Sequence, residues 1–109
     1  MQDLMIQMNT LKNKLNLAIK ELKTRGINKA KAEADYRTAL AEKILVERDK
    51  GTPVTIINDV CRGDKKIAQL KMERDITETL YDTCMQAIYA TKLEMNVLMD
   101  LMSAERKGE

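Results

Sequence analysis

The stretch "DKGTPVTIINDVCRGDKK", residues 49–66, separates two long runs of strong helix formers. It contains the only proline of the chain and two of its four glycines. Gly51 is expected just after a helix end, where a left-handed backbone costs glycine least. Thr52 followed by Pro53 is typical of an N-cap and first helical residue, and Gly63 is expected to end the helix that follows. A β-strand is the rival interpretation because "VTII" is β-branched, but these start and stop signals favour a short amphipathic corner helix over residues 53–62.

The flanking runs carry apolar residues at alternating spacings of three and four, which predicts long helices over residues 2–49 and 64–106. Asp64 is a credible N-cap for the second of them. Gly26 would allow a kink in the first, after which a rotated stripe is expected to resume. The predicted contact positions are Leu4, Met8, Leu11, Leu15, Ala18 and Leu22, then Ala30, Glu33, Tyr36, Leu40 and Ile44. In the second helix they are Ile67, Leu70, Arg74, Thr77, Tyr81, Cys84, Ile88, Thr91, Met95, Leu98 and Met102.

Two such helices with a short connection predict an all-α fold, a long antiparallel coiled-coil-like hairpin with a corner helix. We expect residues 1–109 to form a single helical domain. Pairing Lys50 with Asp64 would place Tyr36 beside Glu78 and Tyr81.

The composition indicates a binding protein rather than an enzyme. A third of the residues are charged, aromatic residues make up 3%, and histidine is absent. Histidine is the commonest general base and the commonest metal ligand, and no catalytic, cofactor-binding or metal-binding motif stands out. Cys61 and Cys84 are predicted to be reduced thiols, with Cys84 a small core residue.

The net charge is only +2, but the charges are unevenly distributed. Residues 12–31 are mostly basic and residues 73–105 mostly acidic. One interpretation is that the two helices complement each other; another is that the basic stripe contacts phosphates or an acidic protein surface. The hypothetical partner-binding residues are Lys20, Lys23, Arg25, Lys29, Lys31, Arg62, Lys65, Lys66 and Lys71.

Nucleic-acid binding is the alternative function. The short helix, the glycine turn and the following basic helix start superficially resemble a helix-turn-helix, with Arg62, Lys65, Lys66 and Lys71 at the start of the second helix. Binding of this kind would depend on phosphate contacts and would fall steeply with salt. A third interpretation is a structural coiled-coil spacer.

More apolar residues occur than one hairpin seam can bury, which predicts self-association at the end where both termini lie. A homodimer forming a four-helix bundle is the simplest arrangement; the alternative is that the first helix bends at Gly26 and covers these residues. The predicted self-association residues are Met5, Ile6, Leu93, Val97, Met99 and Leu101.

The sequence from Ala30 to about Leu98 resembles short helical accessory proteins of phages and prophages of Gram-positive bacteria. The motifs that carry the resemblance are Ala32–Arg37 ("AEADYR"), Gly51–Thr55 ("GTPVT"), Arg62–Gly63, and Tyr81, Ile88 and Lys92–Met95 ("KLEM"). The resemblance implies a small protein that binds host or phage proteins. Some such proteins inhibit defence nucleases such as CRISPR effectors, and others accompany replication and recombination proteins.

These observations together predict a non-enzymatic protein in the cytoplasm of a bacterial host cell. No apolar run is long enough to span a membrane, and the start of the chain lacks the pattern of a signal peptide. The leading hypothesis is a modulator or inhibitor of a host nucleic-acid-handling or defence protein.

Overall fold

The computed structural model describes residues 2–108 and contains three helices in that range, α1 (Gln2–Asp49), α2 (Val54–Gly63) and α3 (Lys65–Gly108). No strand occurs within these residues. The all-α helical-hairpin fold class predicted from the sequence is therefore confirmed. Gly26 does not interrupt α1, which is helical throughout.

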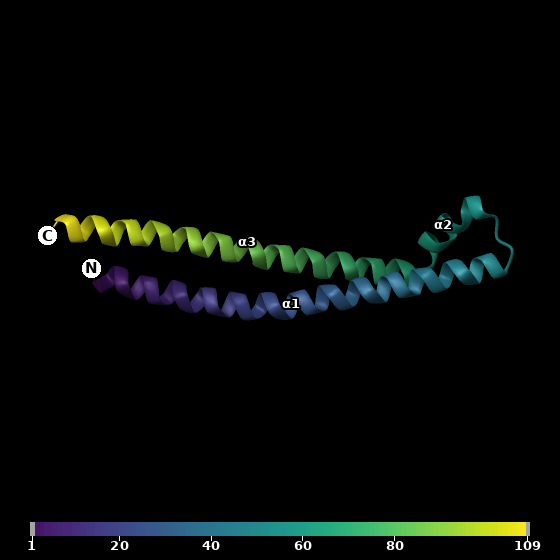
Figure 1. Ribbon diagram of the computed structural model, residues 1–109, viewed down its shortest axis with the longest axis horizontal. Coiled ribbons are helices and arrows are strands. Elements are labelled where there is room, and N and C mark those ends of the chain that lie inside the picture. The colour runs from purple at the N-terminus through teal and green to yellow at the C-terminus, as the bar shows by residue number, and fades with distance from the viewer. Residues whose placement is uncertain (1, 109) are drawn as a thin grey trace. The chain divides into compact units, whose positions relative to one another are not determined.

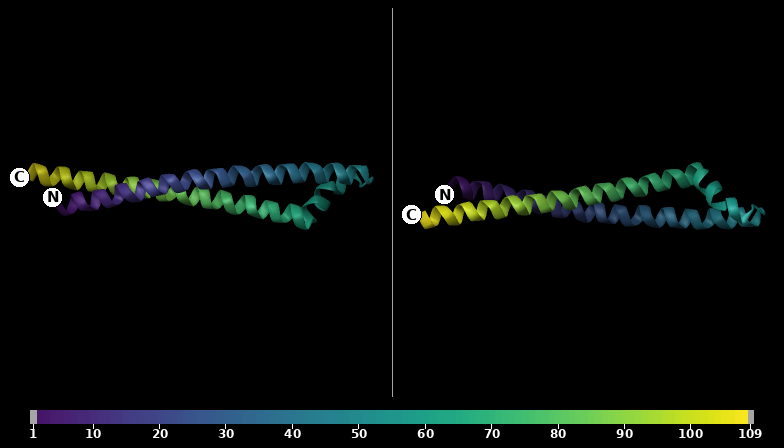
Figure 2. Two further views of the ribbon diagram at one scale, coloured as in Figure 1. Left: turned by 90° about the horizontal axis from the view of Figure 1, so that it is seen from below. Right: turned by 90° about the horizontal axis from the view of Figure 1, so that it is seen from above.

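The contacts divide the chain into two compact units, to which both long helices contribute. The terminal unit comprises residues 1–24 and 81–109, and the corner unit comprises residues 25–80. In the terminal unit, the first turn of α1 and the last turn of α3 lie at the same end (Figure 1), and the two further views in Figure 2 agree. In the corner unit, α2 leads from the end of α1 back to the start of α3 (Figure 1).

The seam of the terminal unit is apolar and follows the predicted positions. Every predicted contact residue of α1 from Leu4 to Leu22 is buried or half-buried, and so is every one of α3 from Tyr81 to Met102. The Cys84 thiol lies 3.4 Å from the carbonyl oxygen of Ala18, which fixes the level at which the helices meet. Thr91 is fully buried, and its hydroxyl donates to the Ala87 carbonyl one turn back at 2.8 Å. A polar seam residue is thus satisfied within its own helix.

The seam of the corner unit is more polar than we expected. On α3 the predicted residues Ile67, Leu70, Arg74 and Thr77 are buried or half-buried. On α1 the prediction that Ala30 belongs to the contact stripe is wrong, because Ala30 is exposed. The other predicted positions of α1 are half-buried as expected: Glu33, Tyr36, Leu40 and Ile44. The spacing of the terminal unit also continues past Gly26, and it brings a further set to half-buried positions: Arg25, Lys29, Ala32, Ala39 and Lys43. Long basic side chains can occupy such positions because their stems pack while their charged heads find partners.

The expected register was also wrong: Lys43 rather than Lys50 lies beside Asp64, a shift of about two helical turns. The guanidinium carbon of Arg74, rather than Glu78 or Tyr81, lies over the Tyr36 ring, 4.6 Å from its centroid. Asp64 meets Lys43 at 3.7 Å, so the last turns of α1 extend past the start of α3. The reason is that the connection is not a tight turn: it contains α2, whose Ile57 and Cys61 are buried.

The corner is closed by a Schellman motif at the end of α1. The amide of Thr52 donates to the carbonyl of Glu47 at 3.1 Å, the amide of Gly51 donates to the carbonyl of Arg48 at 3.0 Å, and Gly51 has φ +82°. The predicted cap of α3 is confirmed, because Oδ2 of Asp64 accepts from the amide of Ile67 at 3.1 Å. The predicted capping role of Thr52 is wrong. Pro53 is the N-cap of α2 without a side-chain bond, and the Thr52 hydroxyl donates to the Glu47 carboxylate instead.

We predict opposite effects for two glycine substitutions in the corner. Gly51→Ala should destabilise the protein by about 1 kcal/mol, because a Cβ strains a left-handed backbone even though open space surrounds it. Gly63→Ala should be neutral or stabilise by up to about 1 kcal/mol, since Gly63 is helical and its Cβ would also meet nothing. Thermal unfolding followed by circular dichroism measures both, and equal effects would contradict this account of the corner.

Candidate functional site

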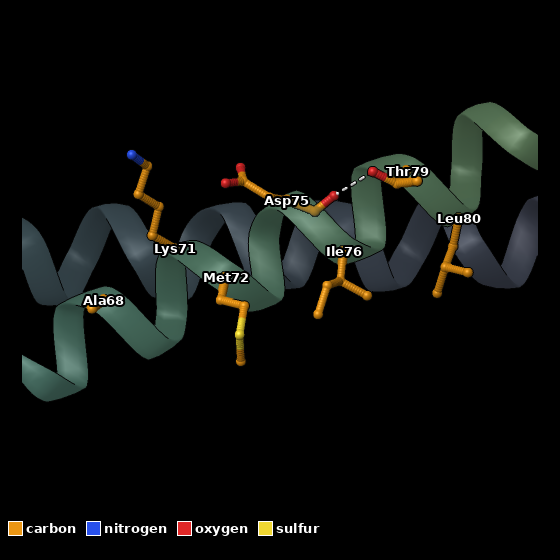
Figure 3. Close-up of a pocket in the computed structure, with 7 residues that line it drawn as sticks. All are labelled: Ala68, Lys71, Met72, Asp75, Ile76, Thr79 and Leu80. Carbon is orange, nitrogen blue, oxygen red and sulfur yellow. Dashed lines mark hydrogen bonds between the residues drawn. The ribbon is translucent and has the colours of Figure 1, made fainter.

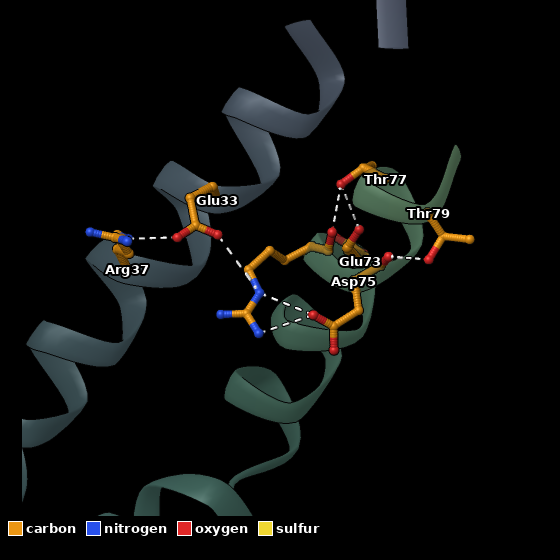
Figure 4. A network of polar contacts seen from close by, with 7 residues as sticks. Glu33, Arg37, Glu73, Asp75, Thr77 and Thr79 are labelled. Atoms are coloured by element: carbon orange, nitrogen blue, oxygen red, sulfur yellow. Dashed lines mark hydrogen bonds and ion pairs between the residues drawn. The ribbon is translucent and has the colours of Figure 1, made fainter. Parts of the chain in front are cut away.

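A cluster of charged side chains crosses the seam of the corner unit around Arg74 (Figure 4). The Arg74 guanidinium donates from Nε and Nη2 to Oδ1 of Asp75 at 3.1 and 3.0 Å, and its Nε lies 3.7 Å from Oε2 of Glu33. Arg37 donates to the other oxygen of Glu33 at 2.6 Å. The hydrogen bond with Asp75, followed by the charges of Asp75 and Glu33, raises the pKa of Arg74. With Tyr36 against the guanidinium face, the cluster joins α1 to α3.

A second cluster surrounds the buried carboxylate of Glu47, which is 6% exposed. Oε2 accepts from the Thr52 hydroxyl at 2.7 Å, and Oε1 lies 3.2 Å from Nζ of Lys43 and 3.9 Å from Nζ of Lys50. Lys43 also reaches Asp64, the cap of α3. The Thr52 hydrogen bond, and after it the one from Lys43, lowers the pKa of Glu47. The same Glu47 bond raises the pKa of Lys43, while the Ile67 amide and then the charge of Lys43 lower the pKa of Asp64.

Both clusters pair acids with bases, and this chemistry favours structural roles over catalysis. Their acids and bases stabilise one another's charged forms, whereas a general acid or base needs a pKa near the working pH. Within residues 2–108, no group of three or more His, Cys, Asp or Glu residues could hold a metal ion. Cys61 and Cys84 are free and buried, as a core role requires.

An apolar groove runs along α3 in the corner unit (Figure 3). It has a volume of about 470 Å³ and is lined by Ala68, Lys71, Met72, Asp75, Ile76, Thr79 and Leu80. Met72, Ile76 and Leu80 follow one another at one-turn intervals and point the same way, while Lys71 and Asp75 lie on the other side of the groove. The three apolar side chains are 55%, 49% and 45% exposed. All seven lining residues belong to α3, so this is an open surface whose apolar side chains have the one-turn spacing of helix anchors.

The predicted partner-binding residues are not gathered into one surface. Lys20 and Lys23 belong to the terminal unit and the other seven to the corner unit. Arg25 is half-buried and donates from Nη1 to the Leu80 carbonyl at 2.8 Å, and Lys29 is half-buried too. Lys71 lines the α3 groove, and Lys31 lines a smaller groove between α1 and α3. Exposed cations near the junction of α2 and α3 are Arg62 in the last turn of α2, which pairs with Asp59 at 3.8 Å, and Lys65 and Lys66 at the start of α3.

The predicted self-association residues are all exposed and belong to the terminal unit. They do not lie on one face. Val97 and Leu101 lie one helical turn apart on one side of the α3 seam, whereas Met99 falls on the opposite side. Their roles in self-association remain predictions.

Several residues of the site escaped sequence analysis. Glu47 has a weak signal, the spacing of four residues from Lys43, which is typical of any exposed helix. Its burial depends on how α2 folds back. The α3 groove could have been found from Ala68, Met72, Ile76 and Leu80, which recur every four residues beside the predicted seam.

No protein-family model matches the chain, and neither a curated protein nor a solved structure is detectably similar to it. The resemblance to phage accessory proteins therefore remains a prediction from the motifs quoted above. Among the described helices, none is both long enough and apolar enough to cross a membrane.

We predict that the Glu47 cluster makes stability depend on acidity. A carboxyl whose pKa is lowered by folding contributes stability that is complete above its unfolded pKa of about 4.3, and loses it as the pH falls through the folded value. Thr52→Val removes the main cause of the lowered pKa, so the wild type should unfold at a higher temperature at pH 7.

The difference in melting temperature between wild type and Thr52→Val should shrink between about pH 5 and pH 3. Lys43, which pairs with the carboxylate, stays charged throughout this range because its pKa is raised. Thr55→Val on the exposed surface of α2 is the matched control and should show no such change. A difference of the same size at pH 7 and pH 3 would contradict the assignment.

Proposed function

We propose that the chain is a non-enzymatic protein-binding module that captures an amphipathic helix of its target in the α3 groove. The observation that carries this proposal is the exposed row of Met72, Ile76 and Leu80 along that groove. Large apolar side chains at one-turn spacing are the anchors of helix-in-groove recognition. Methionine adapts its shape to a partner, and Lys71 at the edge of the groove offers a positive charge to orient it.

The nature of the target rests on the motif resemblance alone. On that basis we propose a phage-derived modulator or inhibitor of a host nucleic-acid-handling or defence protein, with anti-CRISPR-like action as one form. Occupying a helix that the target needs for its own assembly would inhibit it without chemistry. The paired Arg74 and Glu47 clusters support this view, because they stabilise the corner unit that presents the groove.

We predict that Ile76→Glu abolishes target capture. The tagged full-length chain would be incubated with nuclease-treated lysate of a Gram-positive bacterium, and bound proteins quantified by mass spectrometry against the variant. Candidate targets would then be purified and titrated, and the variant should bind at least about tenfold more weakly, because a buried charge replaces a central anchor. Ile27→Glu is the matched control: the same change at 53% exposure in the same unit should leave affinity unchanged.

Equal binding by wild type and Ile76→Glu would show that the groove is not the target site. Binding that occurs only in lysate without nuclease, and that falls steeply with salt, would favour the nucleic-acid alternative. Absence of any specific target for the wild type would favour the structural spacer.

A further inference from the structure

The part of α3 in the terminal unit carries a second stripe that the hairpin does not use. Its members are spaced by four and three residues like the seam, and all of them are exposed: Thr83, Ala87, Ala90, Glu94, Val97 and Leu101. The stripe lies about 100° around the helix from the seam. Two seams separated by such an angle are what a helix needs when it contacts two neighbours in a four-helix bundle.

Heptad positions show which residues of α1 share this face. In the corner unit, a small groove between the helices is lined on one side by Asn28, Lys31 and Asp35 of α1 with Glu73 and Ile76 of α3. Residues separated by multiples of seven lie on the same side of the seam. On α3, such steps lead from Glu73 to Glu94 and from Ile76 to Val97. On α1, they lead from Asn28 to Lys14 and from Lys31 to Leu17. Lys14 and Leu17, both exposed, therefore flank the seam on the same side as Glu94.

Lys12 lies on the opposite side. Seven-residue steps lead from Lys12 to Glu33 and Leu40, which line a different groove together with Arg37 and Arg74. The face defined by Ala87, Ala90, Glu94, Val97 and Leu101 of α3 with Lys14 and Leu17 of α1 is called the Glu94 face below.

We propose that the Glu94 face packs against the same face of a second copy, so that α3 of each chain lies on α1 of the other. Charge decides between the two ways of stacking these faces. On the Glu94 face the charged residue of α3 is Glu94 and that of α1 is Lys14, and both are exposed. Stacking α3 on α3 would bring like charges together, whereas stacking α3 on α1 brings opposite charges together.

These charges are available for a partner. Among the described residues, no ion pair involves Lys14 or Glu94. These opposite charges therefore do not form ion pairs with each other within one hairpin.

The levels of the residues fit a two-fold axis parallel to the helices. The contact between Cys84 and Ala18 sets the register. Lys14 precedes Ala18 by as many residues as Ile88 follows Cys84, so Lys14 of the copy lies over the small side chains of Ala87 and Ala90. Its flexible stem can then extend towards Glu94, while Leu17 and Val97 contribute apolar area.

The test is a charge-exchange cycle on the full chain, with dimer dissociation measured by analytical ultracentrifugation at low salt. The wild type should sediment at twice the 12.5 kDa mass of the chain. Glu94→Lys and Lys14→Glu should each weaken the dimer by about tenfold, because each places like charges across both halves of a two-fold interface. The double variant Glu94→Lys/Lys14→Glu should recover most of the loss.

Lys12→Glu, the same change two positions away on the opposite side, should leave dissociation unchanged. Circular dichroism of every variant shows whether the helices persist. Val97→Asp should also weaken the dimer, because it places a charge in the apolar part of the face while Glu94 and Lys14 stay unchanged. A monomeric wild type, a dimer insensitive to Glu94→Lys, or a double variant no better than the singles would each overturn the proposal. Ile76 shares the heptad position of Val97 but belongs to the corner unit, so sedimentation of Ile76→Glu is measured as well: a dimer that persists while target capture is lost separates the two surfaces.

Discussion

The buried carboxylate of Glu47 is the interaction on which the corner of this hairpin depends. It accepts from Thr52 in the turn and pairs with Lys43 on α1, and Lys43 in turn contacts Asp64, which caps α3. The end of one long helix, the turn and the start of the other are thereby joined through a single connected set of charges. Such a set can be stable in a half-buried place because every member has a partner of the opposite sign or a hydrogen bond.

The two units solve the same packing problem with different chemistry. In the terminal unit the seam consists mainly of Leu, Met and Ile, so its stability comes from burial of apolar area. Its polar member, Thr91, makes its hydrogen bond within its own helix. In the corner unit Arg25, Arg74 and Lys43 occupy seam positions and make directional contacts with Leu80, Glu33 and Asp64. Apolar contacts tolerate sliding, whereas directional contacts specify register. Specificity is thus concentrated near the corner and bulk apolar burial near the chain ends.

The sequence was sufficient to predict what depends on local chemistry and period. The three helices, the contact positions of α3, the Gly51 turn and the Asp64 cap all follow from residue spacing and backbone preference. The register and the charged contacts of α1 did not follow, because they depend on α2 lying between the long helices rather than on any residue of α1. Thr52 shows the limit most clearly: its position suits a cap, but a buried carboxylate offered its hydroxyl a stronger partner. The α3 groove was missed for a related reason. An apolar row can be recognised as exposed only when it is known which residues of the helix form the seam.

The order in which these contacts can form follows from their separation along the chain. Lys43 and Asp64 are close in sequence, Arg25 and Leu80 are 55 residues apart, and Ala18 and Cys84 are 66 apart. The entropy of closing a loop rises with its length, so the corner contacts are the least costly to form first. Each turn formed there shortens the effective loop for the next pair, and the hairpin can close progressively towards its ends. The directional contacts would then set the alignment before the apolar residues meet, which protects a Met-rich seam from closing in the wrong register.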